Sequence, residues 1–296
     1  AVGYKTGTAV TTGVGNTLVG GLSGDALTEG QYNSVLGRSA LSAATTGSFN
    51  VALGSFSLLS NTTGADNVSV GYDSLANNTT ASYNTAVGRN ALKTNILGSK
   101  SVALGYSALE AQNFTTATDS YNTAVGYEAG HAVTTGVQNT LIGGLAGDAL
   151  TTGGFSVAVG YEALSTEDAH GNNVAVGYKA LKTLNAGADG FNTAVGDHSG
   201  TSLTTGTYNT LIGAQSGDAL TTGQENVAVG TATLTADTQG RNSVAIGHSA
   251  LEAQNFTTAT ESHNVAIGHN TGKAITTGLK NTLLGSQTGR ALTDAD

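Results

Sequence analysis

Side chains able to do metal or acid–base chemistry are few in this sequence. The chain has 296 residues, with no cysteine, six histidines and twenty acidic residues. His248 and His269 hold equivalent positions in two similar segments, and His263 lies between them. Imidazole rings gathered in this way could bind a metal ion, but no acidic side chain is spaced to support them. We therefore expect neither a metal site nor a cofactor.

Catalytic motifs are absent as well. The sequence contains no nucleophile elbow, no phosphate-binding loop and no histidine pair with metal-ligand spacing. Its carboxylates are scattered in turn-like segments, and a glycan-cleaving pair would need much longer loops than these. The sequence predicts that the protein is not an enzyme.

Aromatic side chains are the next candidates, because their flat faces can stack on sugar rings. Tyr127, Tyr161 and Tyr178 each follow a recurring glycine, while Phe114 and Phe256 hold equivalent places in two insertions. These five residues could contact a glycan or a protein receptor on a cell surface. The alternative, which we favour, is that the tyrosines shield corners of the fold and the phenylalanines cover the insertions.

Composition excludes several classes of partner. The formal net charge is −9, which argues against a basic surface for nucleic acid or an anionic membrane. No apolar run approaches the roughly 20 residues of a membrane helix. We expect no nucleic-acid partner and no membrane insertion of this segment.

An internal repeat organises the whole chain. Thirteen of the sixteen intervals between the recurring glycines are 17 residues, two are 21 and one is 19. The sequence therefore predicts seventeen coils of about 17 residues in one continuous region, 1–296. These glycines stand at positions 3, 20, 37, 54, 71, 88, 105, 126, 143, 160, 177, 196, 213, 230, 247, 268 and 285.

Each position of the repeat follows its own rule. The residue before the glycine is Val, Ile or Leu, and the residue three before it is almost always Val or Thr. Between them stands mostly Ala, with large exceptions at Leu18, Leu141, Leu211 and Leu283. Such triplets read as short strands, so we predict an all-β chain whose strands stack in parallel as a β-solenoid.

Asparagine dominates the position four before the glycine. In a stack of coils these amides would lie above one another, each hydrogen-bonded to the next and to the turn backbone. The predicted ladder consists of Asn16, Asn33, Asn50, Asn67, Asn84, Asn122, Asn139, Asn173, Asn192, Asn209, Asn226, Asn264 and Asn281.

A second apolar face in each strand favours an oligomer. Residues one and three before the glycine share one face, and the Ala or Leu between them points the other way. A single coil has one interior, so we expect the Ala and Leu face to be covered by a neighbouring subunit. The four leucines favour this interpretation over the alternative that small alanines lie at the surface.

The segments "NSVAIGHSAL" (242–251), "HNVAIG" (263–268) and "NVAVGYKAL" (173–181) resemble the head repeat of trimeric autotransporter adhesins, the YadA-like head. Similar repeats occur in phage tail fibres. The resemblance implies a left-handed parallel β-roll, three chains around one axis and a role in attachment. The coils here are a few residues longer than that pattern, and no neck, stalk or anchor is seen.

Together these observations predict an extracellular, non-enzymatic fibre or adhesin segment that forms a homotrimer. A phage tail fibre on a virion and a bacterial surface adhesin fit about equally well. A self-assembling structural filament without a receptor is the main alternative. Ice binding through the "TTG" threonines is a further one, but adjacent threonines place one side chain in and one out.

Overall fold

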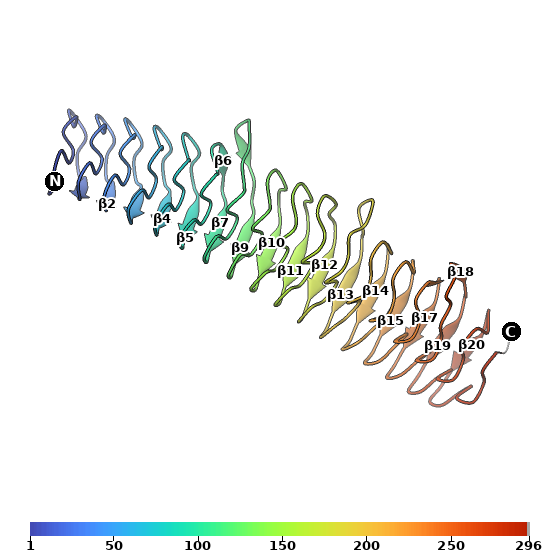
Figure 1. The fold of residues 1–296 in the computed structure, drawn as a ribbon. Coiled ribbons are helices and arrows are strands. Elements are labelled where there is room, and N and C mark those ends of the chain that lie inside the picture. The colour runs from blue at the N-terminus through green and yellow to red at the C-terminus, as the bar shows by residue number, and fades with distance from the viewer. Residues whose placement is uncertain (295–296) are drawn as a thin grey trace. The chain divides into compact units, whose positions relative to one another are not determined.

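A computed structural model describes residues 1–294 as an all-β chain without helices. Among these residues no helix is long and apolar enough to cross a membrane. The chain divides into two compact units, Ala1–Thr152 and Gly153–Asp296. We describe each unit by itself; Figure 1 labels their strands.

Unit 1 contains eight three-residue strands that pair in chain order, and two further two-residue strands, one of which lies in an insertion. Val2 adds an isolated parallel bridge to Val19. The eight strands are β1 (Thr17–Val19), β2 (Ser34–Leu36), β3 (Val51–Leu53), β4 (Val68–Val70), β5 (Thr85–Val87), β7 (Val102–Leu104), β9 (Thr123–Val125) and β10 (Thr140–Ile142).

Unit 2 repeats this arrangement. Up to residue 294, its eight three-residue strands also pair with one another in chain order. They are β11 (Val157–Val159), β12 (Val174–Val176), β13 (Thr193–Val195), β14 (Thr210–Ile212), β15 (Val227–Val229), β17 (Val244–Ile246), β19 (Val265–Ile267) and β20 (Thr282–Leu284).

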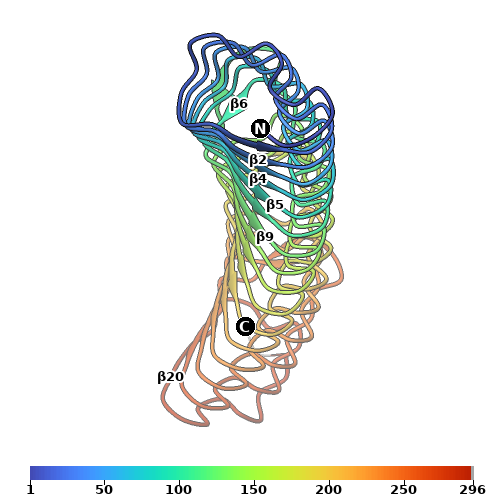
Figure 2. The same ribbon diagram turned by 90° about the vertical axis from the view of Figure 1, so that its left-hand side faces the viewer.

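All these pairings are parallel and in register. Thr85, Ala86 and Val87 of β5, for example, lie opposite Val102, Ala103 and Leu104 of β7. Each coil supplies one such strand, and turns complete the circuit before the next coil begins (Figure 2). The predicted all-β, parallel β-solenoid is therefore confirmed within each unit.

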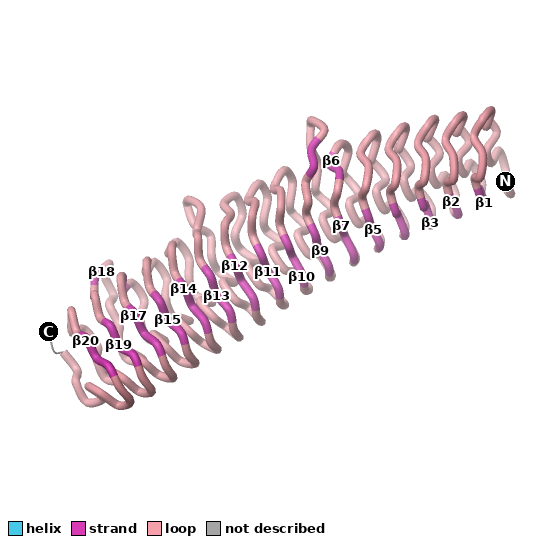
Figure 3. The backbone as a smooth tube through the Cα atoms, turned by 180° about the vertical axis from the view of Figure 1, so that it is seen from behind, coloured by secondary structure: helices cyan, strands magenta, loops and turns pink. Residues whose placement is uncertain are grey.

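Each four-residue insertion adds a short strand that pairs with a short strand of the preceding coil. In unit 1, β6 (Gly98–Ser99) pairs with β8 (Thr118–Asp119). In unit 2, β16 (Gly240–Arg241) pairs with β18 (Thr260–Glu261). Figure 3 shows the loop next to the coil labelled β6 protruding beyond the neighbouring coils.

The inward face of the strands is the opposite of the one we expected. The central Ala or Leu of the strands is buried, except for the partly exposed Leu283 of β20, whereas the residues on either side of it are partly or fully exposed. The Ala and Leu face is therefore the core and needs no subunit to cover it. The apolar face left outside is formed by the flanking Val, Ile, Leu and Thr residues.

The four leucines that replace the central alanine fill space inside pairs of neighbouring coils; they are Leu18, Leu141, Leu211 and Leu283. Four residues after the recurring glycine, the chain has either Leu or a second Gly, both with positive φ, as at Leu92 (50°) and Gly147 (56°). A Cβ placed on Gly147 would lie 2.7 Å from Leu141 Cδ2 and 3.0 Å from Leu150 Cδ1. Leu141 thus occupies the volume that a leucine at position 147 would take.

The recurring glycine is required by both conformation and space. Gly88 has φ of 137°, a region that residues with a side chain rarely adopt. A Cβ on Gly88 would lie 2.2 Å from the carbonyl oxygen of Gly105 in the next coil. Neighbouring backbones therefore approach closely only because this position has no side chain.

Candidate functional site

The exposed side of the parallel strands is a uniform surface that the repeat creates. We call it the outer sheet face and define it by the first and third residues of each three-residue strand, such as Thr123 and Val125 of β9. All of these residues are Thr, Ser, Val, Ile or Leu, so the face carries no charge. Leu36 is 54% exposed and Ile142 and Ile212 are 38% exposed. Isolated apolar residues are normal at a surface, but repeated rows of them indicate an interaction face.

Exposed aromatic rings flank the strands on both sides. Tyr127, Tyr161 and Tyr178 are exposed just after the strands, as are Tyr72 and Tyr106. A second column lies five residues before the recurring glycine and is also exposed: Tyr32, Phe49, Tyr83, Tyr121, Phe155, Phe191 and Tyr208. The rings stack on one another along a column, as between Tyr106 and Tyr127, whose centroids are 5.4 Å apart. Stacking covers one face of each ring in such a pair.

Phe114 and Phe256 are not surface contacts. Their side chains are only 5% and 6% exposed. A Cβ on Gly98 would lie 2.7 Å from Phe114 Cδ2, so this ring packs directly over the glycine of β6. The possibility that these phenylalanines are exposed receptor contacts is wrong, because each ring closes its insertion over the core.

The thirteen asparagines lie where a ladder requires them. Asn50 is typical: its backbone N–H and its Nδ2 donate to Asn33 Oδ1 at 2.9 and 3.2 Å. Its Nδ2 also donates to the Gly64 carbonyl at 2.9 Å. Eleven of the asparagines are fully buried, and Asn16 and Asn281 are partly exposed. The ladder is a structural device that joins each coil to the next.

A second buried polar column was missed by our sequence analysis. It stands seven residues after the recurring glycine, in seven of the nine coils that carry Leu at the fourth position; the other two have Ala44 and Leu184 there. Its members are Asn61, Asn78, Asn95, Gln112, Glu167, Asp237 and Gln254. The signal was present in the sequence, because coils of the Gly type carry an aliphatic residue at this position instead.

One network of this column occurs twice, with a single change of charge. In unit 1, Gln112 Nε2 donates to Asn95 Oδ1 at 3.2 Å and to Ser101 Oγ at 2.9 Å. In unit 2, Gln254 Nε2 donates to Asp237 Oδ2 at 2.7 Å and to Ser243 Oγ at 2.8 Å. Asp237 thus replaces an asparagine, and its burial raises the pKa of the carboxyl group.

The threonine rows form hydrogen bonds between neighbouring coils. Thr28 Oγ1 donates to the Thr45 carbonyl at 3.0 Å, and Thr204 Oγ1 donates to the Thr221 carbonyl at 3.1 Å. The second threonine of a pair, such as Thr46 or Thr205, points to solvent. One hydroxyl of each such pair is therefore already bonded to the next coil, as the in-and-out expectation requires.

The histidines do not gather into one cluster. His248 and His269 stack with centroids 5.4 Å apart, while His263 Nε2 lies 3.5 Å from Glu261 Oε2. Within residues 1–294, the group with metal-ligand spacing is Glu167, Asp168 and His170, whose ligand atoms lie within 4.8 Å. The buried Glu167 carboxylate already accepts backbone N–H bonds from His170 at 3.3 Å and Ala186 at 3.1 Å.

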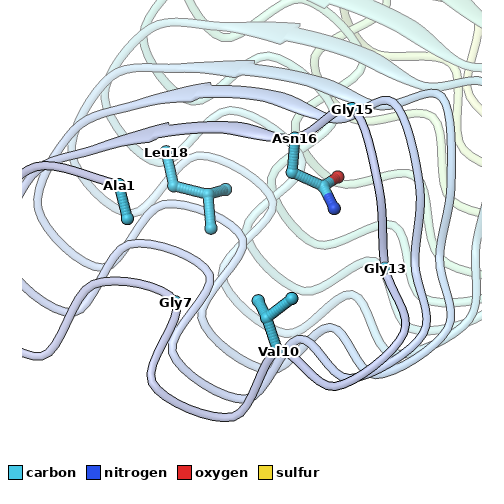
Figure 4. Close-up of a pocket in the computed structure, with 7 residues that line it drawn as sticks. All are labelled: Ala1, Gly7, Val10, Gly13, Gly15, Asn16 and Leu18. Atoms are coloured by element: carbon cyan, nitrogen blue, oxygen red, sulfur yellow. The ribbon is translucent and has the colours of Figure 1, made fainter.

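The first coil of unit 1 has an open hollow. Leu18, Asn16 and Val10 point into it, and Ala1, Gly7, Gly13 and Gly15 complete its lining (Figure 4). Asn16 Nδ2 donates to the Gly30 carbonyl of the next coil at 2.8 Å, as Asn33 and Asn50 do to the coils that follow them. The side chains that line the hollow are apolar except for Asn16, and they include no arrangement of catalytic groups.

Comparison with known proteins gives no assignment: no family model, curated protein or solved structure matches this chain.

Proposed function

We propose that this chain is a segment of an extracellular, non-enzymatic fibre that forms a homotrimer and serves attachment, as a phage tail fibre or a bacterial surface adhesin. The observation that carries the proposal is the uncharged outer sheet face. Its aliphatic and threonine rows repeat in every coil of both units, with exposed leucines and isoleucines among them. Burying such a face would stabilise an assembly by about 25 cal/mol for each Å² of apolar surface.

The number of subunits and the role in attachment come from the resemblance of the coil motif to adhesin head repeats. A face that runs along successive coils suits a partner with the same repeat, because identical rows can be matched over many coils. Three chains around a common axis would each contribute one outer sheet face to a shared interior. The exposed turns would then remain available for a cell-surface glycan or protein receptor.

Native mass tests the assembly. We expect light scattering of the purified chain to give the mass of three chains, and Val176→Asp to give one chain. Val176 belongs to the outer sheet face, so a charge there should disrupt the interface while leaving the coil folded. Thr205→Asp is the matched control, because Thr205 is exposed in a turn away from the strands. A folded wild-type monomer would sink the proposal.

Attachment needs its own test. The labelled trimer should bind intact cells or a glycan array, and Val176→Asp should lose the gain in avidity that three linked copies provide. Open-ended assemblies of growing mass, without any cell or glycan binding, would instead favour a structural filament that has no receptor.

A further inference from the structure

Two tyrosine pairs stack across neighbouring coils. Tyr106 and Tyr127 in unit 1 have ring centroids 5.4 Å apart and an interplanar angle of 9°. Tyr161 and Tyr178 in unit 2 have centroids 5.8 Å apart and an angle of 14°. All four rings are close to half exposed. Each pair therefore presents two phenols to solvent, held face to face by the coil spacing.

A carboxylate accompanies each pair. Glu128 hydrogen-bonds the Tyr127 hydroxyl and thereby raises the pKa of that phenol. Glu162 does the same to Tyr161. A phenol that loses an electron must also lose its proton, and a hydrogen-bonded carboxylate is positioned to accept that proton. Glu128 and Glu162 thus supply a proton acceptor for one member of each pair.

In unit 2 the partner ring is held in place as well. Lys179 Nζ lies 4.8 Å from the centre of the Tyr178 ring, and His198 meets that ring edge-on at 5.1 Å. In-register stacking of β7 with β9, and of β11 with β12, fixes the spacing of the residues that follow these strands. The two phenols of each pair consequently need little movement to bring their ring carbons together.

We propose that Tyr106–Tyr127 and Tyr161–Tyr178 are sites of oxidative tyrosine coupling, which joins neighbouring coils covalently in the presence of a haem peroxidase and hydrogen peroxide. Each phenol loses one electron and one proton to give a phenoxyl radical. The two radicals combine through the ring carbons next to their hydroxyls, and the hydrogens on those carbons move to the oxygens. One carbon–carbon bond replaces two carbon–hydrogen bonds, while one peroxide is reduced to two waters.

The chain contains its own control. Tyr32 stacks on Phe49, and Phe191 stacks on Tyr208, both with centroids 5.4 Å apart. Their rings are equally parallel, at 14° and 5°, but one member of each pair has no hydroxyl group. Geometry alone would treat all four stacks alike, whereas coupling of two phenoxyl radicals selects the tyrosine pairs.

The experiment treats the purified full chain with horseradish peroxidase and hydrogen peroxide. We expect the blue fluorescence of dityrosine in the band of single-chain mass on a denaturing gel. Cleavage after glutamate should then yield two linked fragment pairs, 30–110 with 111–128 and 129–162 with 168–225. Tyr127→Phe should abolish the first linked pair and leave the second intact.

A gain-of-function variant completes the test. Phe49→Tyr converts the Tyr32 stack into a tyrosine pair, so a new link should join fragments 6–38 and 39–89 after trypsin cleavage. The proposal would be overturned by dityrosine found only between chains. Links at the isolated Tyr83 in preference to the stacked pairs, or a first linked pair that survives Tyr127→Phe, would overturn it as well.

Discussion

Leu141 and Gly147 share one volume: the leucine side chain fills the space in which a side chain at position 147 would lie, 2.7 Å from its Cδ2 atom. The same relationship links Leu211 with Gly217, where the distance is 2.9 Å. The core of a coil is therefore filled in one of two ways. Most coils have a leucine four residues after the recurring glycine, whereas a pair of Gly-type coils shares the leucine that stands two residues before the second recurring glycine of the pair.

This relationship predicts how stability changes when the leucine side chain is moved from position 141 to position 147. Leu141→Ala should lower the free energy of unfolding by about 2–5 kcal/mol, because it leaves a cavity. Gly147→Leu alone should also destabilise, by about 1–3 kcal/mol, because it overpacks the coil. The double variant should recover part of the loss, since it recreates the arrangement of Ala175, Leu181 and Leu184.

Urea unfolding followed by circular dichroism measures the effect. We expect a favourable coupling of about 1–3 kcal/mol between the two substitutions, a magnitude found for residues in contact. Strictly additive effects of Leu141→Ala and Gly147→Leu would show that the two positions do not compete for the same space.

The recurring glycine gives a second prediction. Gly88→Ala should cost about 3 kcal/mol or more, because it combines an unfavourable φ with contact against the Gly105 carbonyl. Thr46→Ala, an exposed position in a turn, should change the unfolding free energy by less than about 0.5 kcal/mol. Thermal unfolding of both variants provides the comparison, and equal melting temperatures would refute the requirement for glycine.

Much of the fold could be predicted because the repeat states it many times. The triplet ending in glycine gave the strand and its parallel stacking, and the column of asparagines gave the ladder. The sequence did not show in the same way which face of the strand points into the core. Alternation shows which residues share a face, but both faces here are apolar, so hydrophobicity alone does not decide which one is inside.

Side-chain volume decides which face of the strand points inward. The interior of a 17-residue coil is narrow, and Ala86 leaves room there for Leu92. The sequence contains this signal, because the large residues Leu18, Leu141, Leu211 and Leu283 occur in coils whose fourth residue after the glycine is again Gly. The stacked tyrosines were harder to foresee, since their ring geometry depends on side-chain torsions that the repeat does not specify.

The asparagine ladder gives a third prediction. Asn209 Nδ2 donates to the Gly223 carbonyl at 2.9 Å, and its Oδ1 accepts the Asn226 N–H at 3.1 Å. Asn209→Ala would leave these buried groups without partners and should cost about 2–4 kcal/mol, since each unsatisfied group costs about 1–3 kcal/mol. Asn209→Ser should cost less, because Ser156 Oγ accepts the Asn173 N–H at 3.4 Å in the same role. Urea midpoints would decide, and equal losses for the two variants would contradict the ladder's contribution.

The buried Asp237 predicts a dependence of stability on pH. Its carboxylate accepts hydrogen bonds from Gly240 N–H at 3.0 Å, Phe256 N–H at 3.1 Å and Gln254 Nε2 at 2.7 Å. These bonds lower its pKa, but desolvation is the larger effect, and the pKa in the folded state is raised. The folded protein therefore holds this proton more tightly than the unfolded chain does.

The raised pKa determines how stability changes with pH. The contribution of Asp237 to stability is fully present below the pKa of the unfolded state, about 3.9. It is lost as the pH rises through the raised pKa of the folded state. Asp237→Asn removes this titration and restores the arrangement seen at Asn95. We expect the variant to match the wild type at low pH and to be more stable at neutral pH.

Asn95→Asp should transfer the same pH dependence to unit 1. Urea midpoints measured across the acidic range test both variants, and a wild type that gains stability over Asp237→Asn as the pH rises would show that hydrogen bonding outweighs desolvation.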